Sequence, residues 1–386
     1  MNFTVNRTEM AKALKTALKI ATNARINQAM SGVLIEANAE KGIITATAVD
    51  ACSRIQYRLK CEHIQEVGAA VFPDVVSQAL LLLDGETVEI SANTVGNNTV
   101  DISAGGCSYN LSLYKIEEFP KIKVQYPDKF VHIKGANSLI SHSVFAAVDI
   151  SENKATHGMQ CVKLSFGGGD AMAEATNGTI IARAVTPHAT DGNLEVVVYE
   201  SALDKLVQVI NASDDLYIGV KDKFVYFMTE NVIFTTLRYT GETLDLEKVF
   251  ERIVPAYGAT ADASDLFNLV SGAIAVLSDN DDRCVNLVIS DGKIAIKTKT
   301  ALSAASTSIP ATDTVSTPED GFNYNPKWLL DCFRRASGPT KITTDKRGFM
   351  LIEANHNRYC VMPRGPVVIR VKEVKPKKKA KVKAAA

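Results

Sequence analysis

Two short segments of this sequence have residue types that could bind a phosphate or a metal ion. Phe166-Gly167-Gly168-Gly169-Asp170 is glycine-rich, as phosphate-binding loops are, but no Gly-Lys-Ser/Thr follows it and the pattern predicts no helix after it. It is typical of a hairpin turn. His157 and Cys161 have a spacing seen between zinc ligands. Because the sequence offers no second ligand pair, a loop histidine and a strand cysteine are favoured.

The other reactive side chains are scattered along the chain. Asp279, Asp281 and Asp282 cluster and could bind a divalent cation weakly, although a solvated turn explains them better. The seven cysteines form no CxxC pair, which argues against a zinc site and against a disulfide framework. The sequence also lacks HExxH, GxSxG and the DxDxDG calcium loop. We therefore predict no catalytic residue, no metal and no cofactor, and expect a protein that binds DNA and other proteins rather than an enzyme.

Basic side chains form stripes on two predicted helices. Lys12, Lys15 and Lys19 fall on one face of the first helix, opposite Met10 and Leu14. On the last helix the stripe consists of Lys327 and Arg334, seven residues apart, with Arg335 beside them. Such stripes suit phosphate contacts, and a solvated helix face is the alternative.

An internal repeat determines which elements carry these stripes. Residues 147–164 and 275–287 share the order Ala-Val, then Ser-Glu/Asp-Asn, then Cys-Val-Lys/Asn-Leu, and residues 21–35 contain a weaker echo. Self-similarity at a fixed period is the signature of repeated structural units. The chain therefore reads as three diverged copies of one unit of roughly 125 residues.

Each copy reads as two β-α-β-β-β halves, so the expected fold class is α+β. Apolar residues at three- and four-residue spacing predict the helices, which are Met10–Leu18, Val75–Leu83, Ile140–Val148, Ala202–Ile210, Phe267–Leu277 and Trp328–Ala336. Thr8 is a plausible N-cap of the first helix, and Ser264 or Asp265 of the fifth. The last strands of the three copies are expected at Asn110–Tyr114, Ile233–Tyr239 and Tyr359–Met362.

Composition shifts set the expected domain boundaries and location. Linkers are predicted near Lys121–Asp128 and Arg252–Thr260, which gives domains at residues 1–124, 125–253 and 254–371, with a disordered basic tail at 372–386. The tail carries seven lysines and one glutamate, so the remaining residues, with 36 basic and 42 acidic groups, are acidic overall. No apolar run has the ~20 residues of a membrane span. The first residues lack the apolar segment of a signal peptide, so we expect a cytoplasmic protein without membrane contact.

Six short motifs, in order along residues 1 to about 364, carry a resemblance to a known family. They resemble phrases of the bacterial DNA polymerase III β subunit, the sliding clamp. The motifs are Met1-Asn2-Phe3-Thr4-Val5, Ala48-Val49-Asp50, Glu118-Phe119-Pro120, Ala175-Thr176-Asn177-Gly178, Asn325-Pro326-Lys327-Trp328-Leu329-Leu330-Asp331 and Tyr359-Cys360-Val361-Met362-Pro363.

The resemblance implies three tandem clamp domains per subunit and a head-to-tail homodimer that closes a ring around duplex DNA. Such a ring holds DNA without reading its sequence, and tethers the replicative polymerase and clamp-loader subunits through short linear peptides. Arg25 matches a DNA-contacting arginine of the family. The implied ring contacts are Tyr109, Leu111, Val276 and Leu277.

The resemblance also implies a pocket for the partner peptides. Carried over by motif, the pocket consists of Met159, Thr176, Gly178, Thr179, Ile180, Ile181, Leu244, Lys248, Val249, Asn325, Trp328, Val361, Met362, Pro363 and Arg364. The family has His-Arg where this chain has Thr179-Ile180, and Phe-Pro-Asp-Tyr where it has Thr243-Leu244-Asp245-Leu246. It also normally ends soon after the pocket, whereas this chain continues for over twenty residues.

These departures leave a second interpretation open. The chain could be a specialised or mobile-element-encoded clamp paralogue that acts as a DNA-bound protein scaffold with altered partner specificity. The lysines of the tail could add nonspecific phosphate affinity, or they could serve only as a solubilising end.

Overall fold

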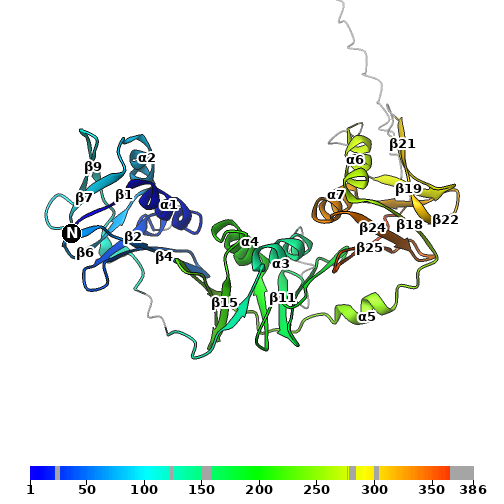
Figure 1. Cartoon of the computed structure of the whole chain (residues 1–386), viewed down its shortest axis with the longest axis horizontal. Helices are drawn as coiled ribbons and strands as arrows, with labels where there is room; N and C mark the ends of the chain where they lie inside the picture. The colour runs from blue at the N-terminus through cyan, green and yellow to red at the C-terminus, as the bar shows by residue number, and fades with distance from the viewer. Residues whose placement is uncertain are drawn as a thin grey trace, which may run out of the picture. The chain divides into compact units, whose positions relative to one another are not determined.

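The computed structural model describes residues 1–21, 27–121, 125–148, 158–275, 277, 284–299 and 304–365. The chain divides into two compact units (Figure 1). Unit 1 contains Met1–Glu247 and His356–Arg358, and unit 2 contains Lys248–Asn355 and the residues from Tyr359 onward. Several segments singled out from the sequence lie outside the described residues, namely Arg25, Val276, His157, the acidic trio 279–282 and the basic tail.

Unit 1 confirms the β-α-β-β-β repeat four times within the described residues. Its first two half-units are β1 (Asn2–Asn6), α1 (Arg7–Leu18), β2 (Val33–Asn38), β3 (Ile43–Val49) and β4 (Ser53–Lys60), then β6 (Gly68–Phe72), α2 (Asp74–Leu82), β7 (Thr87–Asn93), β8 (Thr99–Ala104) and β9 (Cys107–Ser112). The next two are β10 (Val131–Ile133), α3 (Ala136–Val144), β11 (Cys161–Gly167), β12 (Asp170–Thr176) and β13 (Ile180–Thr186), then β14 (Leu194–Tyr199), α4 (Glu200–Val209), β15 (Leu216–Lys221), β16 (Phe224–Met228) and β17 (Val232–Leu237).

The same order appears twice more in the later part of the chain. These half-units are β18 (Tyr257–Asp262), α6 (Ala263–Ile274), β19 (Val285–Ser290), β20 (Lys293–Lys299) and β21 (Ala304–Pro310), then β23 (Phe322–Tyr324), α7 (Pro326–Arg335), β24 (Pro339–Thr344), β25 (Met350–Ala354) and β26 (Asn357–Val361). Apart from three short 3-10 helices, the described elements outside the repeat are β5 (His63–Glu66), β22 (Thr312–Val315) and the short helix α5 (Leu246–Glu251).

The eight-stranded sheet of unit 1 crosses the predicted boundary between the first two domains. One sheet has the order β5-β1-β7-β8-β9 and a second the order β10-β15-β16-β17-β4-β3-β2-β6. In the second sheet β17 pairs antiparallel with β4, with Phe234 opposite Ile55 and Thr235 opposite Arg54. This continuous ladder explains why residues 1–247 form one compact unit, although the sequence predicts a boundary at 124/125.

The helix starts differ in detail from the sequence prediction. Asn6, not Thr8, caps α1, because its side-chain oxygen accepts the backbone N–H of Glu9 at 3.1 Å and the hydroxyl of Thr8 at 2.7 Å. Asp262, not Ser264 or Asp265, caps α6 by accepting the N–H of Ser264 at 2.8 Å. In both cases the cap is the last residue of the preceding strand, so the strand leads directly into the helix.

Two further elements differ from the prediction. The last strand of the first copy is Cys107–Ser112 rather than Asn110–Tyr114, because Gly105 and Gly106 both have positive φ and form a two-residue hairpin turn that pairs Ala104 with Cys107. The predicted linker Arg252–Thr260 is wrong at its end, since Tyr257 already begins β18 and pairs with β24. The extra helix α5 precedes it.

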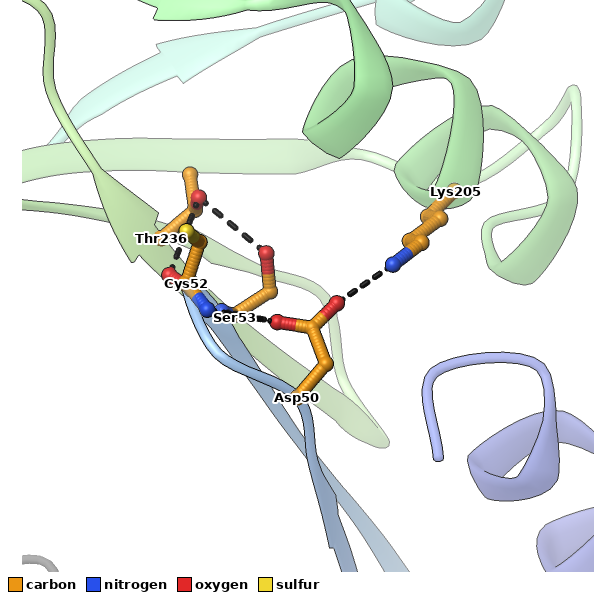
Figure 2. Close-up of polar contacts among 5 residues, drawn as sticks. All are labelled: Asp50, Cys52, Ser53, Lys205 and Thr236. Carbon is orange, nitrogen blue, oxygen red and sulfur yellow. Dashed lines mark hydrogen bonds and ion pairs between the residues drawn. The ribbon is translucent and has the colours of Figure 1, made fainter. Parts of the chain in front are cut away.

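A polar cluster ties the β3–β4 turn to helix α4 in unit 1 (Figure 2). One oxygen of the Asp50 carboxylate accepts the N–H groups of Cys52 and Ser53 at 2.7 and 2.6 Å, and the other forms an ion pair with Lys205. Nearby, the Ser53 hydroxyl donates to Thr236 at 3.2 Å. The turn of the first copy is thus tied to a helix and a strand of the second.

We predict that the ion pair between Asp50 and Lys205 stabilises unit 1. Asp50→Asn keeps the turn's acceptor oxygen but removes the charge, and Lys205→Met keeps the side chain's apolar length. Each should lower the melting temperature, and the double variant should be less destabilised than the sum by on the order of 1 kcal/mol, because each single change leaves a partner without its counter-charge. Lys12→Met, at an exposed lysine, is the control. Strictly additive single and double effects would show that the pair contributes nothing.

Candidate DNA-facing and partner-binding surfaces

The lysine stripe of α1 divides into two groups in the structure. Lys12, Lys15 and Lys19 are all exposed, while Met10 and Leu14 on the opposite face are buried, as the spacing predicts. Lys19 differs from the other two, because its ammonium group donates to the backbone carbonyl of Gln208 at 2.6 Å. This bond joins α1 to the C-terminal turn of α4. Lys19 therefore links two helices within unit 1.

The stripe of α7 is partly neutralised by its own helix. Arg335 donates to the carbonyl and the carboxylate of Asp331 at 2.9 and 3.2 Å, and only 23% of its side chain is exposed. Arg334 is 61% exposed, with its guanidinium 3.8 Å from Asp331 and 5.6 Å from the centre of the Phe267 ring. Lys327 is exposed as well. Lys327 and Arg334 are therefore the basic groups of α7 best placed to meet a phosphate.

Lys12 borders an acidic hollow in unit 1. The hollow lies between α1, β4, the loop before β15 and the β16–β17 turn, and Asp214, Asp215 and Glu230 contribute to its lining. Burial and the charges of Glu9 and Asp214 raise the pKa of Tyr57, which also lines it, so the phenol stays neutral. Positive potential on this surface is consequently confined to a stripe, which agrees with the acidic composition of the chain outside its tail.

Half of the predicted partner pocket lies in unit 1, on the β12–β13 turn. The Thr176 hydroxyl donates to the carbonyl of Ile180 at 2.8 Å and accepts the N–H of Gly178 at 3.1 Å. The Asn177 side chain accepts the N–H groups of Thr179 and Ile180 at 2.9 and 3.0 Å. The turn is therefore rigid, and Thr179, at its tip, is exposed.

The apolar part of this half is formed by few side chains. Met159 is half-buried, and a Cβ added at Gly178 would lie in ordinary van der Waals contact with its sulfur at 3.7 Å, so it is the φ of +84° that favours glycine here. Leu244 is 37% exposed. Ile180 and Ile181 are buried, so their side chains support the turn rather than present a surface.

The other half of the predicted pocket lies in unit 2. Asn325 caps α7 by accepting the N–H of Lys327 at 3.1 Å, and the Trp328 ring is buried with the Lys327 ammonium 5.1 Å from its centre. Val361 is buried, whereas Met362 is 37% exposed. Pro363 and Val249 are half-buried, and Lys248 and Arg364 are exposed.

Two of the predicted ring contacts, Tyr109 and Leu111, lie on a strand at the edge of a sheet. β9 is the outer strand of the five-stranded sheet, and its residues Tyr109 and Leu111 are half-buried on the same face. In unit 2, β21 is the outer strand of the sheet β21-β20-β19-β23. Leu277 is half-buried just after α6. An outer strand presents unpaired backbone groups, which suits it for pairing with another chain.

An ion-pair network that was not predicted from the sequence lies beside the unit 1 half of the predicted partner pocket. Arg183 on β13 contacts the Glu174 carboxylate on β12 at 2.6 and 2.7 Å and also pairs with Glu247 on α5. A signal was present, because Glu174 and Arg183 interrupt strands whose neighbours are mostly Ala, Ile and Val. Opposite charges in two adjacent buried strands predict a cross-strand pair.

The chemistry of the described side chains gives no sign of a reactive centre. Burial raises the pKa of Cys161 and of Cys360 to about 12, so both are neutral thiols and poor nucleophiles at physiological pH. Within the described residues, no group of three His, Cys, Asp or Glu side chains is arranged to hold a metal ion. In the same part of the chain, no helix is both long and apolar enough to cross a membrane.

Comparison with known sequences matches the chain to relatives of one kind. Residues 1–127 match the family described as the DNA polymerase III beta subunit, N-terminal domain. A protein named Beta sliding clamp from Mycoplasma capricolum is 21% identical over 308 residues, which covers 77% of this chain and 80% of that protein.

Solved structures extend the similarity of fold beyond the N-terminal part. The DNA polymerase III beta subunit from Thermotoga maritima has a TM-score of 0.82 at 15% identity, covering 95% of this chain and 100% of that one. The DNA polymerase sliding clamp from Bacillus subtilis has a TM-score of 0.82 at 17% identity, covering 95% and 99%. The resemblance predicted from six short motifs is thus confirmed: residues 1–127 match the N-terminal domain of the DNA polymerase III beta subunit, and the fold is shared with solved beta subunits along most of the chain.

Proposed function

We propose that this protein is a DNA sliding clamp, which encircles duplex DNA and tethers a replicative polymerase for processive synthesis. The observation that carries the proposal is the sixfold β-α-β-β-β repeat in the described residues, in which each half-unit supplies one helix. Six equivalent helices per subunit suit a smooth inner surface, whereas a catalytic site would require one copy to differ. The fold shared with the beta subunits supports the same conclusion. The protein then acts without catalysis, metal or cofactor, in the cytoplasm.

The ring requires a second copy of the chain. In this proposal residues 1–124, 125–253 and 254–371 act as three clamp domains, and two subunits join head to tail. Such an interface is heterologous, so different surfaces of the two subunits meet. Tyr109 and Leu111 on the outer strand β9 would meet the region of Val276 and Leu277 of the other copy.

A ring that slides must hold DNA without reading bases. It can use only phosphate contacts, which are independent of sequence and weakened by salt. Lys12 and Lys15 on α1, together with Lys327 and Arg334 on α7, are the exposed cations that fit this role. The acidic hollow beside Lys12 keeps the contact weak, as sliding requires.

Two apolar residues of unit 1, the half-buried Met159 and the more exposed Leu244, fit the binding of partner peptides. Grooves with a few apolar anchors and an ordered polar turn bind short linear segments of other proteins. We propose that the polymerase and clamp-loader subunits dock here. The departures at Thr179-Ile180 and Thr243-Leu246 remove a histidine, an arginine and two aromatic residues from the site, so the preferred peptide relies on apolar contacts rather than on charge.

We predict that the lysines of α1 differ in their effect on DNA binding. The double variant Lys12→Gln/Lys15→Gln should reduce the slope of log K against log salt by about 2, because each lost phosphate contact releases one counterion fewer. Lys19→Gln should change the slope less and lower the melting temperature more, since Lys19 bonds to Gln208. Fluorescence anisotropy of labelled duplex, titrated at several salt concentrations, measures the slope. Equal slope changes at all three lysines would contradict the distinction between Lys12 and Lys15, which contact phosphates, and Lys19, which links two helices.

We predict that Leu111→Arg abolishes the dimer. Burying an unpaired guanidinium against an apolar partner surface costs several kcal/mol, which exceeds the contribution of most single interface residues. Asn110→Arg, at the neighbouring exposed position on the opposite face of β9, is the matched control. Sedimentation at micromolar concentration should give two subunits for the wild type and the control, and one for Leu111→Arg. A wild-type mass of one subunit would argue against the ring itself.

A further inference from the structure

Residues 241–247 of unit 1, here called the strap, run past strands β11, β12 and β14, and Thr243, Leu244 and Leu246 line a cleft together with side chains of these strands. At the start of the strap the Tyr239 hydroxyl donates to the Glu242 carbonyl at 3.4 Å. A Cβ added at Gly158 would lie 3.1 Å from the Tyr239 ring and 3.2 Å from the Glu242 carbonyl oxygen. Gly158 also has a φ of +71°. The strap therefore approaches the sheet so closely at this point that glycine is required.

The end of the strap is fastened by a buried arginine. Arg183 is 8% exposed and Glu174 7% exposed, and the Nε and Nη2 atoms of Arg183 contact the same carboxylate oxygen of Glu174. The remaining Nη1 reaches out to Glu247, whose side chain is 53% exposed. Arg183 thus joins the sheet to the last residue of the strap.

Charge balance keeps this junction intact across the physiological pH range. Burial alone would lower the pKa of Arg183, but hydrogen bonds to Glu247 and Glu174 and the charges of both carboxylates raise it above its usual value. The guanidinium therefore stays protonated. A buried guanidinium with one carboxylate on the sheet and one on the strap is held in a fixed planar geometry, which a lysine would not provide.

Between its two attachments the strap presents an apolar side chain. Leu246 is 6% exposed and packs inward, while Leu244 is 37% exposed. Leu244 and Thr243 line a narrow cleft together with Cys161, Thr176 and Val197, and Glu174 lines the same cleft. Leu244 and Thr176 belong to the predicted partner pocket, so one carboxylate, that of Glu174, lies in the cleft wall and also holds the arginine that fastens the strap.

We propose that Arg183 is a positioning residue for partner binding: through Glu247 it holds the strap against the sheet and so fixes Leu244 as an apolar wall of the peptide site. This inference rests on the proposed function, because it assigns the strap a role in docking polymerase and loader peptides. The peptide that suits such a wall carries an aliphatic or aromatic side chain to pack on Leu244. Without the anchor the strap still exists, but Leu244 samples many positions, and a peptide must order it on binding.

The decisive variant is Glu247→Gln, because Glu247 is half exposed and its loss leaves the Arg183–Glu174 pair in place. Glu251→Gln, on the exposed side of the same helix α5, is the charge-matched control. Binding is measured by fluorescence anisotropy of a labelled peptide with a Gln-Leu-Xaa-Leu-Phe core. Loss of a charged hydrogen bond predicts roughly three- to tenfold weaker binding for Glu247→Gln, and less than a twofold change for Glu251→Gln.

A second measurement tests the anchor without any peptide. Amide hydrogen exchange at residues 243–247 should be faster in Glu247→Gln than in the wild type and in Glu251→Gln, while the melting temperature changes little, because the strap opens locally. Unchanged exchange in this segment overturns the anchoring role. Faster exchange with unchanged peptide affinity overturns the link to partner binding. If the wild type binds no peptide, the proposed docking function falls together with that link, and the exchange rates still decide whether Arg183 anchors the strap.

Discussion

The pairing of β17 with β4 is the constraint on which the structure of unit 1 depends. A β-α-β-β-β half-unit has few strands, so its sheet is poorly buried and its outer strands have unpaired backbone groups. These outer strands therefore need neighbours. Here the neighbour comes from the next copy of the repeat, with Phe234 opposite Ile55 in the shared ladder. The ion pair of Asp50 with Lys205 forms across this same junction (Figure 2), and so does the bond of Lys19 to Gln208. The ladder thus fixes the angle between neighbouring repeats, and the side chains reinforce it.

The pairing of β17 with β4 also brings basic side chains of one repeat close to acceptor groups of the next. Lys19 at the end of α1 and Lys205 on α4 bond to a carbonyl and a carboxylate of a neighbouring repeat. Arg335 is likewise paired with Asp331 within its own helix. In the proposed clamp, Lys12, Lys15, Lys327 and Arg334 remain for contact with DNA, in a chain that is acidic outside its C-terminal tail. Few cations on these helices would give the weak, uniform contact that sliding needs.

The fold was largely predictable from the sequence, because the apolar spacing of each helix and the repeat of residues 147–164 at 275–287 both report the half-unit. The boundaries were less predictable. Asn6 and Asp262 act as caps because the preceding strand ends on them, and the Gly105-Gly106 turn sets the position of β9; both depend on strand pairing that a linear pattern does not display. The bond of Lys19 to Gln208 was not predictable for a similar reason, since the two residues are 189 positions apart. The partner pocket was predicted from the family resemblance alone. The contact of Arg183 with Glu247 is visible only in the structure.

The central claim is that two copies of this chain close around duplex DNA. The most direct test is topological retention on a nicked circular plasmid, with the complex isolated by gel filtration and then cut once with a restriction enzyme. A closed ring should stay with the circle through high-salt washing, because the link is mechanical rather than electrostatic. It should leave after linearisation, because it slides off the ends. Release by salt from the intact circle, or retention on the linear product, would contradict it.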